Sequence, residues 1–354
     1  MPAEAFAFFR HACHSNAMRR VLVVRFSSLG DIVLTFPGLD ALSARAYEVH
    51  YLTKESFLPL VGLHPAVARV HSVSDHASLR ELKEKVAELR ALGFEHVYDL
   101  HRNIRSRIVT FLLGVPYTRV RKLRWKEILL FVFRRGTFAR LGIKGIDRPA
   151  ETLRAIEATA VVKAKLKTPK YESDELRKAS SPGYLCVAAE SAWREKEWPA
   201  ERFVEVIRRL KVLWPQIGVV WVGLRKPPAK ALEFVPDAMD LTGKLTIPEV
   251  ANVLAGARLF LGNDSGLMHL AEAAGTPVVA VFGPTSRELG FGPSNPLSRV
   301  VEAEGLWCRP CSKTGRWCIR PLARRKCLLD VSSDAVLAAA KDVWTAREIP
   351  GGTS

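Results

Sequence analysis

The sequence predicts an α/β protein made of two doubly wound domains in tandem, each a parallel sheet covered by helices on both faces. Two observations carry this prediction. Short apolar runs alternate with amphipathic stretches along most of the chain, and one polar, proline-containing stretch at 167–183 interrupts the alternation near the middle. Such alternation favours parallel strands joined by crossover helices. A length of 354 residues also favours two domains over one.

The elements of the first half begin with a buried apolar run at 21–26, which leads into a Ser-Ser-Leu-Gly turn and a helix from about Asp31. The periodicity of the following residues predicts further strands at 47–54 and 96–100, and helices at 79–93, 105–114 and 121–138.

The second half repeats the pattern and closes with a helix over 332–348, whose leading serine is a typical N-cap. Apolar runs predict strands at 184–190, 217–223, 258–264 and 277–283, and amphipathic stretches predict helices at 200–214, 247–257 and 266–275.

The predicted organisation divides the chain into five parts. Residues 1–17 are expected to form a disordered extension, with Met18 as an alternative start of translation. The other expected parts are a first domain at 18–170, a linker at 171–182, a second domain at 183–332, and a C-terminal helix and tail at 333–354.

The chain is strongly basic, with 53 Lys and Arg against 36 Asp and Glu and a net charge of +17. The excess is concentrated: residues 102–148 hold 13 basic residues against two acids, and residues 307–327 hold seven against none. Such a balance favours a polyanionic partner, which leaves nucleic acid, an anionic membrane surface and a phosphorylated substrate as candidates. General solubility is the plainer reading of the same charge.

The turn after the first strand, "RFSSLGDI", places Gly30 and Asp31 at the start of a helix. An ordinary helix cap explains Ser and Asp at such positions. The alternative is that Asp31 faces a cleft between the domains and acts as a general base. The sequence contains neither the GxGxxG fingerprint of nicotinamide-binding domains nor the GxxxxGK[ST] phosphate loop.

A second polar turn, "GNDSGLMHL", follows the strand predicted at 258–264. The backbone amides of Ser265, Gly266 and Leu267 are expected at a helix N-terminus, where they favour a phosphate group. Asp264 is expected to orient the loop or a sugar hydroxyl, and His269 lies about one helical turn further on.

Five segments in sequence order together resemble glycosyltransferase family 9, the ADP-heptose:lipopolysaccharide heptosyltransferases. These segments are "VLVVRFSSLGDIVLTFPGLDAL", "VYDLHRNIRS", "KEWPAERF", "LTGKLTIPEVANVLAGARLFLGNDSGLMHLAEAAGTPVVAVFGPT" and "WCRPCSKTGRWC". The resemblance implies the GT-B architecture, in which two Rossmann-like domains face each other across a cleft. The acceptor then binds mainly the first domain and the nucleotide sugar the second.

The resemblance also implies roles for individual residues in an inverting transfer that requires no cofactor. Asp31 is the expected general base, and Lys196 is expected to contact the donor phosphates and offset the charge of the leaving group. The expected nucleotide-sugar site comprises Ser191, Lys196, Thr242, Gly243, Asp264, Ser265, Gly266, Leu267 and His269, and the expected acceptor site comprises Ser28, Gly30, Arg102 and Arg105.

One departure from the family pattern affects the donor. Some members carry an acidic residue after the "WxG" strand, where this chain has Arg225, Lys226 and two prolines. A family member that uses another nucleotide sugar or acceptor is therefore the first alternative. A nucleic-acid-binding protein that uses the basic, cysteine-rich segment is the second alternative, although it leaves Asp31 and Lys196 without a role.

The acceptor and the cellular location follow from the charge and the resemblance together. Arg102 and Arg105 suit the carboxylate and phosphate groups of a lipopolysaccharide core. The segment "LRWKEILLFVFRRGTF" mixes Trp, Phe and Arg, and reads equally well as an amphipathic helix on an anionic membrane or as a core helix with basic flanks. The expected location is the cytoplasm, peripheral to the inner face of the cytoplasmic membrane.

Four cysteines, Cys308, Cys311, Cys318 and Cys327, are clustered near the C-terminus. In a cytosolic chain such a cluster favours a structural zinc or iron site over disulfides, and reduced thiols without a metal are nearly as well supported. The cluster also favours the family branch that adds the second core heptose.

Overall fold

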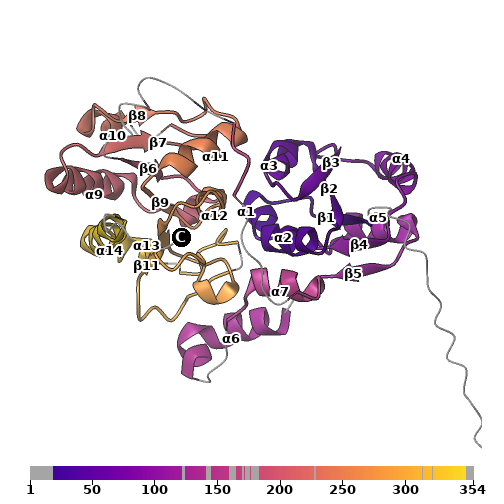
Figure 1. Ribbon diagram of the computed structural model, residues 1–354. Coiled ribbons are helices and arrows are strands. Elements are labelled where there is room, and N and C mark those ends of the chain that lie inside the picture. Colours follow the sequence, from indigo (N-terminus) through magenta and orange to yellow (C-terminus); the bar gives the residue numbers. More distant parts are fainter. Residues whose placement is uncertain are drawn as a thin grey trace, which may run out of the picture.

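The computed structural model describes residues 19–121, 124–140, 145–158, 165–169, 171, 176, 183–226, 229–312, 314–320 and 322–347. The predicted extension at 1–17 lies outside these residues, and only Tyr171 and Leu176 of the predicted linker are described. Within the described part each half of the chain contains one parallel sheet (Figure 1).

The first sheet is entirely parallel, and its first strand lies in the middle. Its five strands are β1 (Arg20–Val24), β2 (Glu48–Lys54), β3 (Val67–Val73), β4 (His96–Asp99) and β5 (Tyr117–Arg119). They lie in the order β3-β2-β1-β4-β5. Alternate residues of β1 enter two different apolar clusters, so both faces of the sheet are covered.

Seven α-helices are described in the first half. They are α1 (Leu29–Val33), α2 (Phe36–Ala44), α3 (Leu58–Gly62), α4 (Leu79–Arg90), α5 (Ile104–Leu113), α6 (Arg124–Arg140) and α7 (Arg148–Ala155), with a 3₁₀ turn, η1 (Glu55–Phe57), before α3. α1, α2 and α3 pack on one face of the sheet and α4 and α5 on the other.

The second sheet has the same plan with one more strand. Its strands are β6 (Tyr184–Ala188), β7 (Gly218–Trp221), β8 (Met239–Asp240), β9 (Leu259–Asn263), β10 (Val278–Phe282) and β11 (Arg299–Glu302). The order is β11-β10-β9-β6-β7-β8, and every described pair is parallel. Four strands, β6, β7, β9 and β10, are buried along nearly their whole length.

Helices again cover both faces of this sheet. They are α9 (Ala200–Leu213), α10 (Ala229–Phe234), α11 (Ile247–Gly256), α12 (Gly266–Ala273), α13 (Lys326–Leu329) and α14 (Ser333–Ala346), with the 3₁₀ turns η2 (Arg194–Lys196) and η3 (Arg287–Leu289). α9 and α14 share one apolar cluster, while α11 and α12 share another. Ser332 caps α14 by accepting a bond from the Ala335 amide at 3.2 Å, as predicted.

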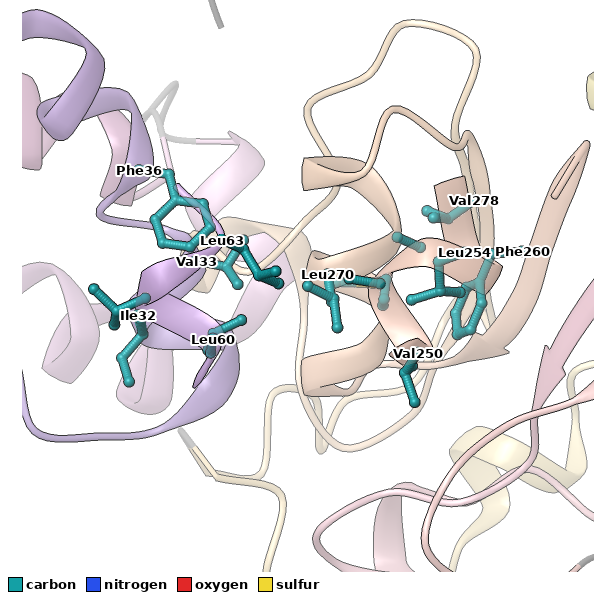
Figure 2. Close-up of a cluster of buried hydrophobic side chains, with 14 of the residues drawn as sticks. Ile32, Val33, Phe36, Leu60, Leu63, Val250, Leu254, Phe260, Leu270 and Val278 are labelled. Carbon is teal, nitrogen blue, oxygen red and sulfur yellow. The ribbon is translucent and has the colours of Figure 1, made fainter. Parts of the chain in front are cut away.

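One apolar cluster runs without interruption from the first domain into the second. Ile32, Val33 and Phe36 of the first domain belong to the same cluster as Leu270 and Leu254 of the second, and Figure 2 shows the two groups facing each other. The contact brings α1 directly against α12. The two helices that follow the predicted functional turns therefore meet at the junction of the domains.

The predicted strands at the centre of each sheet are confirmed, and four strands near the sheet edges were not predicted. These are β3, β5, β8 and β11. The segment predicted as a basic helix at 121–138 is α6, which begins at Arg124 and ends at Arg140. Among the described residues, no helix is long and apolar enough to span a bilayer.

Candidate active site

The order of the strands reverses beside β6 in the second sheet and beside β1 in the first. In doubly wound sheets ligands bind outside the carboxyl ends of the strands at such a point. The loops after β6 and β9 are joined there, because the Ser191 hydroxyl donates to the Asp264 carbonyl at 3.1 Å and the side-chain NH2 of Asn263 donates to the Ala189 carbonyl at 2.7 Å.

Lys196 and Asp264, both predicted as donor-site residues, form a buried ion pair. The Lys196 Nζ lies 2.5 Å from the Asp264 Oδ2, and the two side chains are 13% and 5% exposed. The Thr285 hydroxyl donates to the same carboxylate oxygen at 2.5 Å. Asp264 therefore fixes the direction of the Lys196 ammonium, and a bound anion has to share that ammonium with it.

The helix N-terminus predicted at 265–267 is present. Ser265 is the N-cap of α12, and its hydroxyl accepts from the Met268 amide at 3.5 Å. The first amides of a helix have no intrahelical partner, so the Gly266 and Leu267 N–H groups lie at the positive end of α12. This end lies beside the Lys196–Asp264 pair, because Asp264 directly precedes the cap.

His269 of α12 is buried against Gly30 of α1. A methyl group placed on Gly30 would lie 2.6 Å from the His269 Cδ2, and one on Gly266 would lie 3.0 Å from Leu29. Burial lowers the pKa of His269, opposed by the charges of Asp264, Glu272 and Asp31. The imidazole therefore packs as a neutral group where the two domains meet.

Asp31 lies in the first turn of α1 with three positively charged or donating neighbours. Its Oδ1 is 2.9 Å from the Arg25 guanidinium, and its Oδ2 accepts from the Ser28 hydroxyl at 3.0 Å. Burial raises the pKa of Asp31, but the charges of Arg25 and Arg148 and the bonds from Ser28 outweigh burial and hold it below its usual value. Asp31 is thus an ionised carboxylate at neutral pH.

A cleft of about 480 Å³ opens at the carboxyl ends of β6 and β7. Thr242, a predicted donor-site residue, lines this cleft, and its hydroxyl donates to Asp240 at 2.6 Å. Gly243 follows in a left-handed conformation with φ +68°. Ser191 and Lys196 are the sequence neighbours of Glu190 and Glu197, which both line the cleft.

Arg225, the departure from the family pattern, bridges two of the three glutamates that line this cleft. Its guanidinium pairs with Glu190 at 3.3 Å and with Glu197, and it donates to the Ser191 carbonyl at 2.9 Å. Glu190 in turn accepts from the Leu224 and Arg225 amides at 2.5 Å and 2.9 Å. The loop after β7 is therefore tied to the loop after β6 through Glu190, Ser191 and Glu197.

The predicted acceptor residues Arg102 and Arg105 line a separate cavity of about 690 Å³ at the carboxyl edge of the first sheet. Lys54, His101 and Arg107 line it as well, and none of the described residues around it is acidic. Ser28 and Gly30 do not line this cavity: the Ser28 hydroxyl donates to Asp31, and Gly30 packs against His269. Their contact with an acceptor stays a prediction.

All four clustered cysteines carry free thiols. Burial, together with the neighbouring thiols, raises the pKa of Cys311 to about 11. Burial and the neighbouring thiols, opposed by the charge of Arg309, raise the pKa of Cys327 to about 12. Soft thiolates suit zinc or iron. In the described part of the chain, however, no three His, Cys, Asp or Glu side chains are grouped so as to hold a metal ion.

Sequence reasoning missed several side chains that complete this site. Arg25 and Arg148 act on Asp31, Thr285 acts on Asp264, and Lys54 lines the basic cavity. Thr285 had a recognisable signal, since it follows the strand β10 at the same sheet edge as Asp264. Arg25 opens the turn "RFSSLGDI" itself, and Lys54 ends β2 at the carboxyl edge of the first sheet. Arg148 reaches Asp31 from the separate helix α7, and no local motif marks it.

Two parallel, doubly wound sheets whose helices α1 and α12 meet at the junction of the domains are the architecture of the GT-B fold. The chain belongs to glycosyltransferase family 9 (heptosyltransferase), whose model matches residues 85–318. This confirms the resemblance and makes the protein a glycosyltransferase.

Named relatives fall in both branches of the family. Lipopolysaccharide heptosyltransferase 1 of Pseudomonas aeruginosa is 28% identical over 318 residues, which cover 83% of this chain and 86% of that protein. Lipopolysaccharide heptosyltransferase 2 of Escherichia coli K12 is 24% identical over 313 residues, which cover 80% and 87%. The first-branch protein is the more similar of the two, so these matches do not support the expectation of the second branch.

Solved structures share the fold over nearly the whole chain. The glycosyl transferase family 9 structure from Veillonella parvula has a TM-score of 0.70 at 22% identity, and the match covers 93% of this chain and 97% of that one. The Escherichia coli ADP-heptose lipopolysaccharide heptosyltransferase II has a TM-score of 0.67 at 19% identity, and the match covers 93% and 100%.

Proposed function

We propose that this protein is an inverting heptosyltransferase that moves heptose from ADP-heptose to the inner core of lipopolysaccharide. One observation carries the proposal. The α1 helix with the ionised Asp31 packs directly on α12, whose N-terminus adjoins the Lys196–Asp264 pair. A base and a diphosphate-stabilising group thus come from opposite domains to one junction.

In the proposed reaction Asp31 accepts the proton of an acceptor hydroxyl. The hydroxyl oxygen attacks the anomeric carbon of the sugar from the face opposite the diphosphate, the bond to the diphosphate breaks, and ADP leaves. Inversion at the anomeric carbon follows from this single displacement. Arg25 and Ser28 hold the carboxylate ionised and oriented, which is what a general base requires.

Charge on the departing diphosphate is offset by Lys196 and the N-terminus of α12. Preorganised donors of this kind stabilise developing negative charge, and they need no metal ion to do so. Asp264 and Thr285 hold Lys196 in place. Thr242 and the cleft of about 480 Å³ that it lines are assigned to the nucleotide.

The basic cavity of about 690 Å³ supports an acidic acceptor. Lys54, Arg102, Arg105 and Arg107 surround it, and guanidinium groups bind carboxylates and phosphates in a bidentate manner. The Kdo and phosphate groups of a lipopolysaccharide inner core carry both kinds of charge.

The decisive experiment measures transfer to a Kdo–lipid A acceptor with a panel of nucleotide sugars, beside calorimetric titration with ADP, UDP and GDP. Transfer from ADP-heptose together with ADP-selective binding supports the proposal. Transfer from another nucleotide sugar instead supports the alternative motivated by Arg225, which fills part of the donor cleft with a paired cation.

We further propose that the protein works as a peripheral protein on the cytoplasmic face of the inner membrane. Support comes from α6, where Trp125, Ile128 and Val132 are 55%, 59% and 63% exposed in a helix whose sequence is rich in Lys and Arg. A nucleic-acid partner is disfavoured because it leaves the junction of Asp31 and Lys196 unused. Steeply salt-dependent binding to nucleic acid would reopen that alternative.

A structural zinc or iron at Cys308, Cys311, Cys318 and Cys327 remains a proposal of its own. Four thiols are chemically suitable as ligands of such a metal ion, while the described arrangement of these thiols does not form a metal site. Metal analysis of the purified protein, beside a Cys308→Ser/Cys311→Ser variant, decides it: a stoichiometric metal that the variant loses supports a bound ion.

A further inference from the structure

The segment from Cys308 to Cys327, here called the cysteine segment, contacts the residues around Lys196 one after another. The Arg316 guanidinium lies 4.9 Å from the centre of the Trp193 ring. Arg324 pairs with Glu195 at 2.8 Å, and Arg325 donates to the Glu197 carbonyl. The described part of the cysteine segment therefore packs along the turn η2, which carries Lys196.

Gly315 of this segment lies directly on the side chain of Lys196. A methyl group at Gly315 would lie 2.7 Å from the Lys196 Cγ, 2.9 Å from its Cδ and 2.8 Å from the Pro284 Cγ. The residue has φ +67°, a conformation that glycine adopts without strain. Both the backbone angle and the close contact thus call for glycine where the stem of Lys196 passes.

Arg309 of the same segment supports the ammonium end of Lys196 indirectly, through Thr285 and Asp264. Its guanidinium is buried and donates to the Gly283 and Thr285 carbonyls at 2.5 Å and 2.8 Å, besides pairing with Glu302 at 2.8 Å. Thr285 is the residue whose hydroxyl binds Asp264, the partner of the Lys196 ammonium. Removal of the buried Arg309 would leave the carbonyls of Gly283 and Thr285 without these bonds and release the loop that follows β10.

We propose that the cysteine segment is part of the donor site and positions Lys196 for the donor diphosphate, with Gly315 holding the stem of the lysine and Arg309 holding the partner of its ammonium. Gly315 and Arg309 are positioning residues, since they act through Lys196 and Asp264. The inference rests on the proposed function, in which Lys196 contacts the diphosphate.

The chain supplies a matched control for the test. Gly305 has φ +69° and lies just before the cysteine segment, but a methyl group there meets nothing within 4 Å. Gly315→Ala and Gly305→Ala therefore impose the same backbone strain, and only the first displaces Lys196. We expect Gly315→Ala to weaken ADP binding about fivefold or more and Gly305→Ala to change it less than about twofold.

The experiment titrates ADP by calorimetry into both variants, into Lys196→Ala and into Lys196→Ala/Gly315→Ala, with a thermal unfolding curve for each. The KM for the donor should rise in Gly315→Ala while the KM for the acceptor stays unchanged. In the Lys196→Ala background the glycine substitution should have less than about half of its effect on the binding free energy, because its target is gone.

The outcomes separate the two claims. If Lys196→Ala binds ADP like the wild type, the role of Lys196 in the proposed function is wrong and the inference fails with it. If Lys196→Ala is impaired but Gly315→Ala matches Gly305→Ala, the inference alone is overturned. Should Gly315→Ala not fold, Arg316→Gln decides, because its exposed side chain leaves the core intact: ADP binding weakened at least about twofold supports the inference, and unchanged binding overturns it.

Discussion

Asp31 is the residue whose substitution separates chemistry from binding most cleanly. Asp31→Asn keeps the size and the bond from Ser28 but removes the proton acceptor. We expect transfer to fall by about 10²–10⁴-fold, while calorimetric affinity for ADP stays unchanged because the proposed donor site lies in the other domain. Full transfer by a folded Asp31→Asn enzyme would falsify the assignment of the base.

The pH dependence of transfer tests the electrostatics around Asp31. The charges of Arg25 and Arg148 hold its pKa below the ordinary value of a carboxyl, against burial. The carboxylate is therefore ionised throughout the neutral range, and the acid limb of kcat/KM due to Asp31 should lie below the pH at which an ordinary aspartate titrates. Arg25→Gln leaves burial less opposed, so we expect it to raise that pKa and move the limb towards neutral pH.

A matched substitution controls for loss of surface charge alone. Arg20→Gln removes an exposed arginine from β1, the strand that directly precedes Arg25, and this arginine pairs with Glu48 and not with Asp31. Its profile should match that of the wild type. An acid limb that stays in place in Arg25→Gln would show that Arg25 does not set the ionisation of the base.

At the scale of elements, the contact of α1 with α12 depends on Gly30. A methyl group there would lie 2.6 Å from the His269 ring, and the residue has no positive φ, so the conflict is one of packing alone. We expect Gly30→Ala to lower the free energy of unfolding by about 1–3 kcal/mol and to reduce transfer, because the base and the donor site are pushed apart.

Gly62→Ala provides the control, since Gly62 ends the helix α3 and a methyl group there meets nothing within 4 Å. Urea unfolding and transfer assays should leave this variant close to the wild type or slightly more stable. Equal behaviour of the two variants would mean that the helix junction tolerates the extra volume.

Two strands of the first sheet carry a buried histidine pair that makes stability depend on pH. His50 on β2 bonds His71 on β3 at 2.9 Å. Burial, and then the charges of His50, Arg69 and Lys85 against Glu88, lower the pKa of His71 from 6.5 to about 4. Because the pKa of His71 is lower in the folded protein than in the unfolded chain, the unfolded chain binds its proton more readily. The stability contributed by neutral His71 is therefore complete above pH 6.5 and is lost as the pH falls towards 4.

Urea unfolding at several pH values checks this window. We expect the free energy of unfolding to fall between pH 6.5 and 4, and to fall less steeply in His71→Gln, which cannot titrate there. His64, whose pKa burial also lowers to about 4, keeps part of the slope in the variant. Identical slopes would mean that His71 is not protonated on unfolding.

The elements that sequence could predict are those with a buried apolar run. β1, β6, β9 and β10 carry four or five consecutive buried residues, and all were predicted. β3 is exposed over its first half and β8 has two residues, so neither shows a periodicity that distinguishes a strand from a loop.

The candidate site divides in the same way. Asp31, Lys196, Asp264 and His269 stand in short motifs at strand ends, where sequence alone suggests them. Several of their partners do not, because Arg148 lowers the pKa of Asp31 from 117 positions further along the chain and Gly315 meets Lys196 from 119 positions further along it. Only the fold brings such residues together.

At the scale of the whole molecule, part of the net charge of +17 is gathered around the cavity lined by Lys54, Arg102, Arg105 and Arg107, and part lies in the sequence of α6. One face of α6 is anchored, since Leu130 is fully buried with Leu289 and Glu127 pairs with Arg148 at 3.2 Å. The opposite face exposes Trp125, Ile128 and Val132, three apolar residues at helical spacing that nothing in the described chain covers.

A fixed apolar face in a basic helix suits an anionic lipid surface. Burial of the apolar side chains and attraction of the basic residues to the anionic lipids both hold such a helix on the membrane. We expect the protein to sediment with vesicles of phosphatidylglycerol and phosphatidylethanolamine, more weakly as salt increases. Ile128→Ser/Val132→Ser should reduce that binding about tenfold or more without changing transfer to a soluble acceptor. The control is Val212→Ser on α9, which is 80% exposed but lies on the other domain. If both variants bind vesicles equally, α6 is not the membrane-facing surface, and the acceptor must reach the basic cavity by another approach.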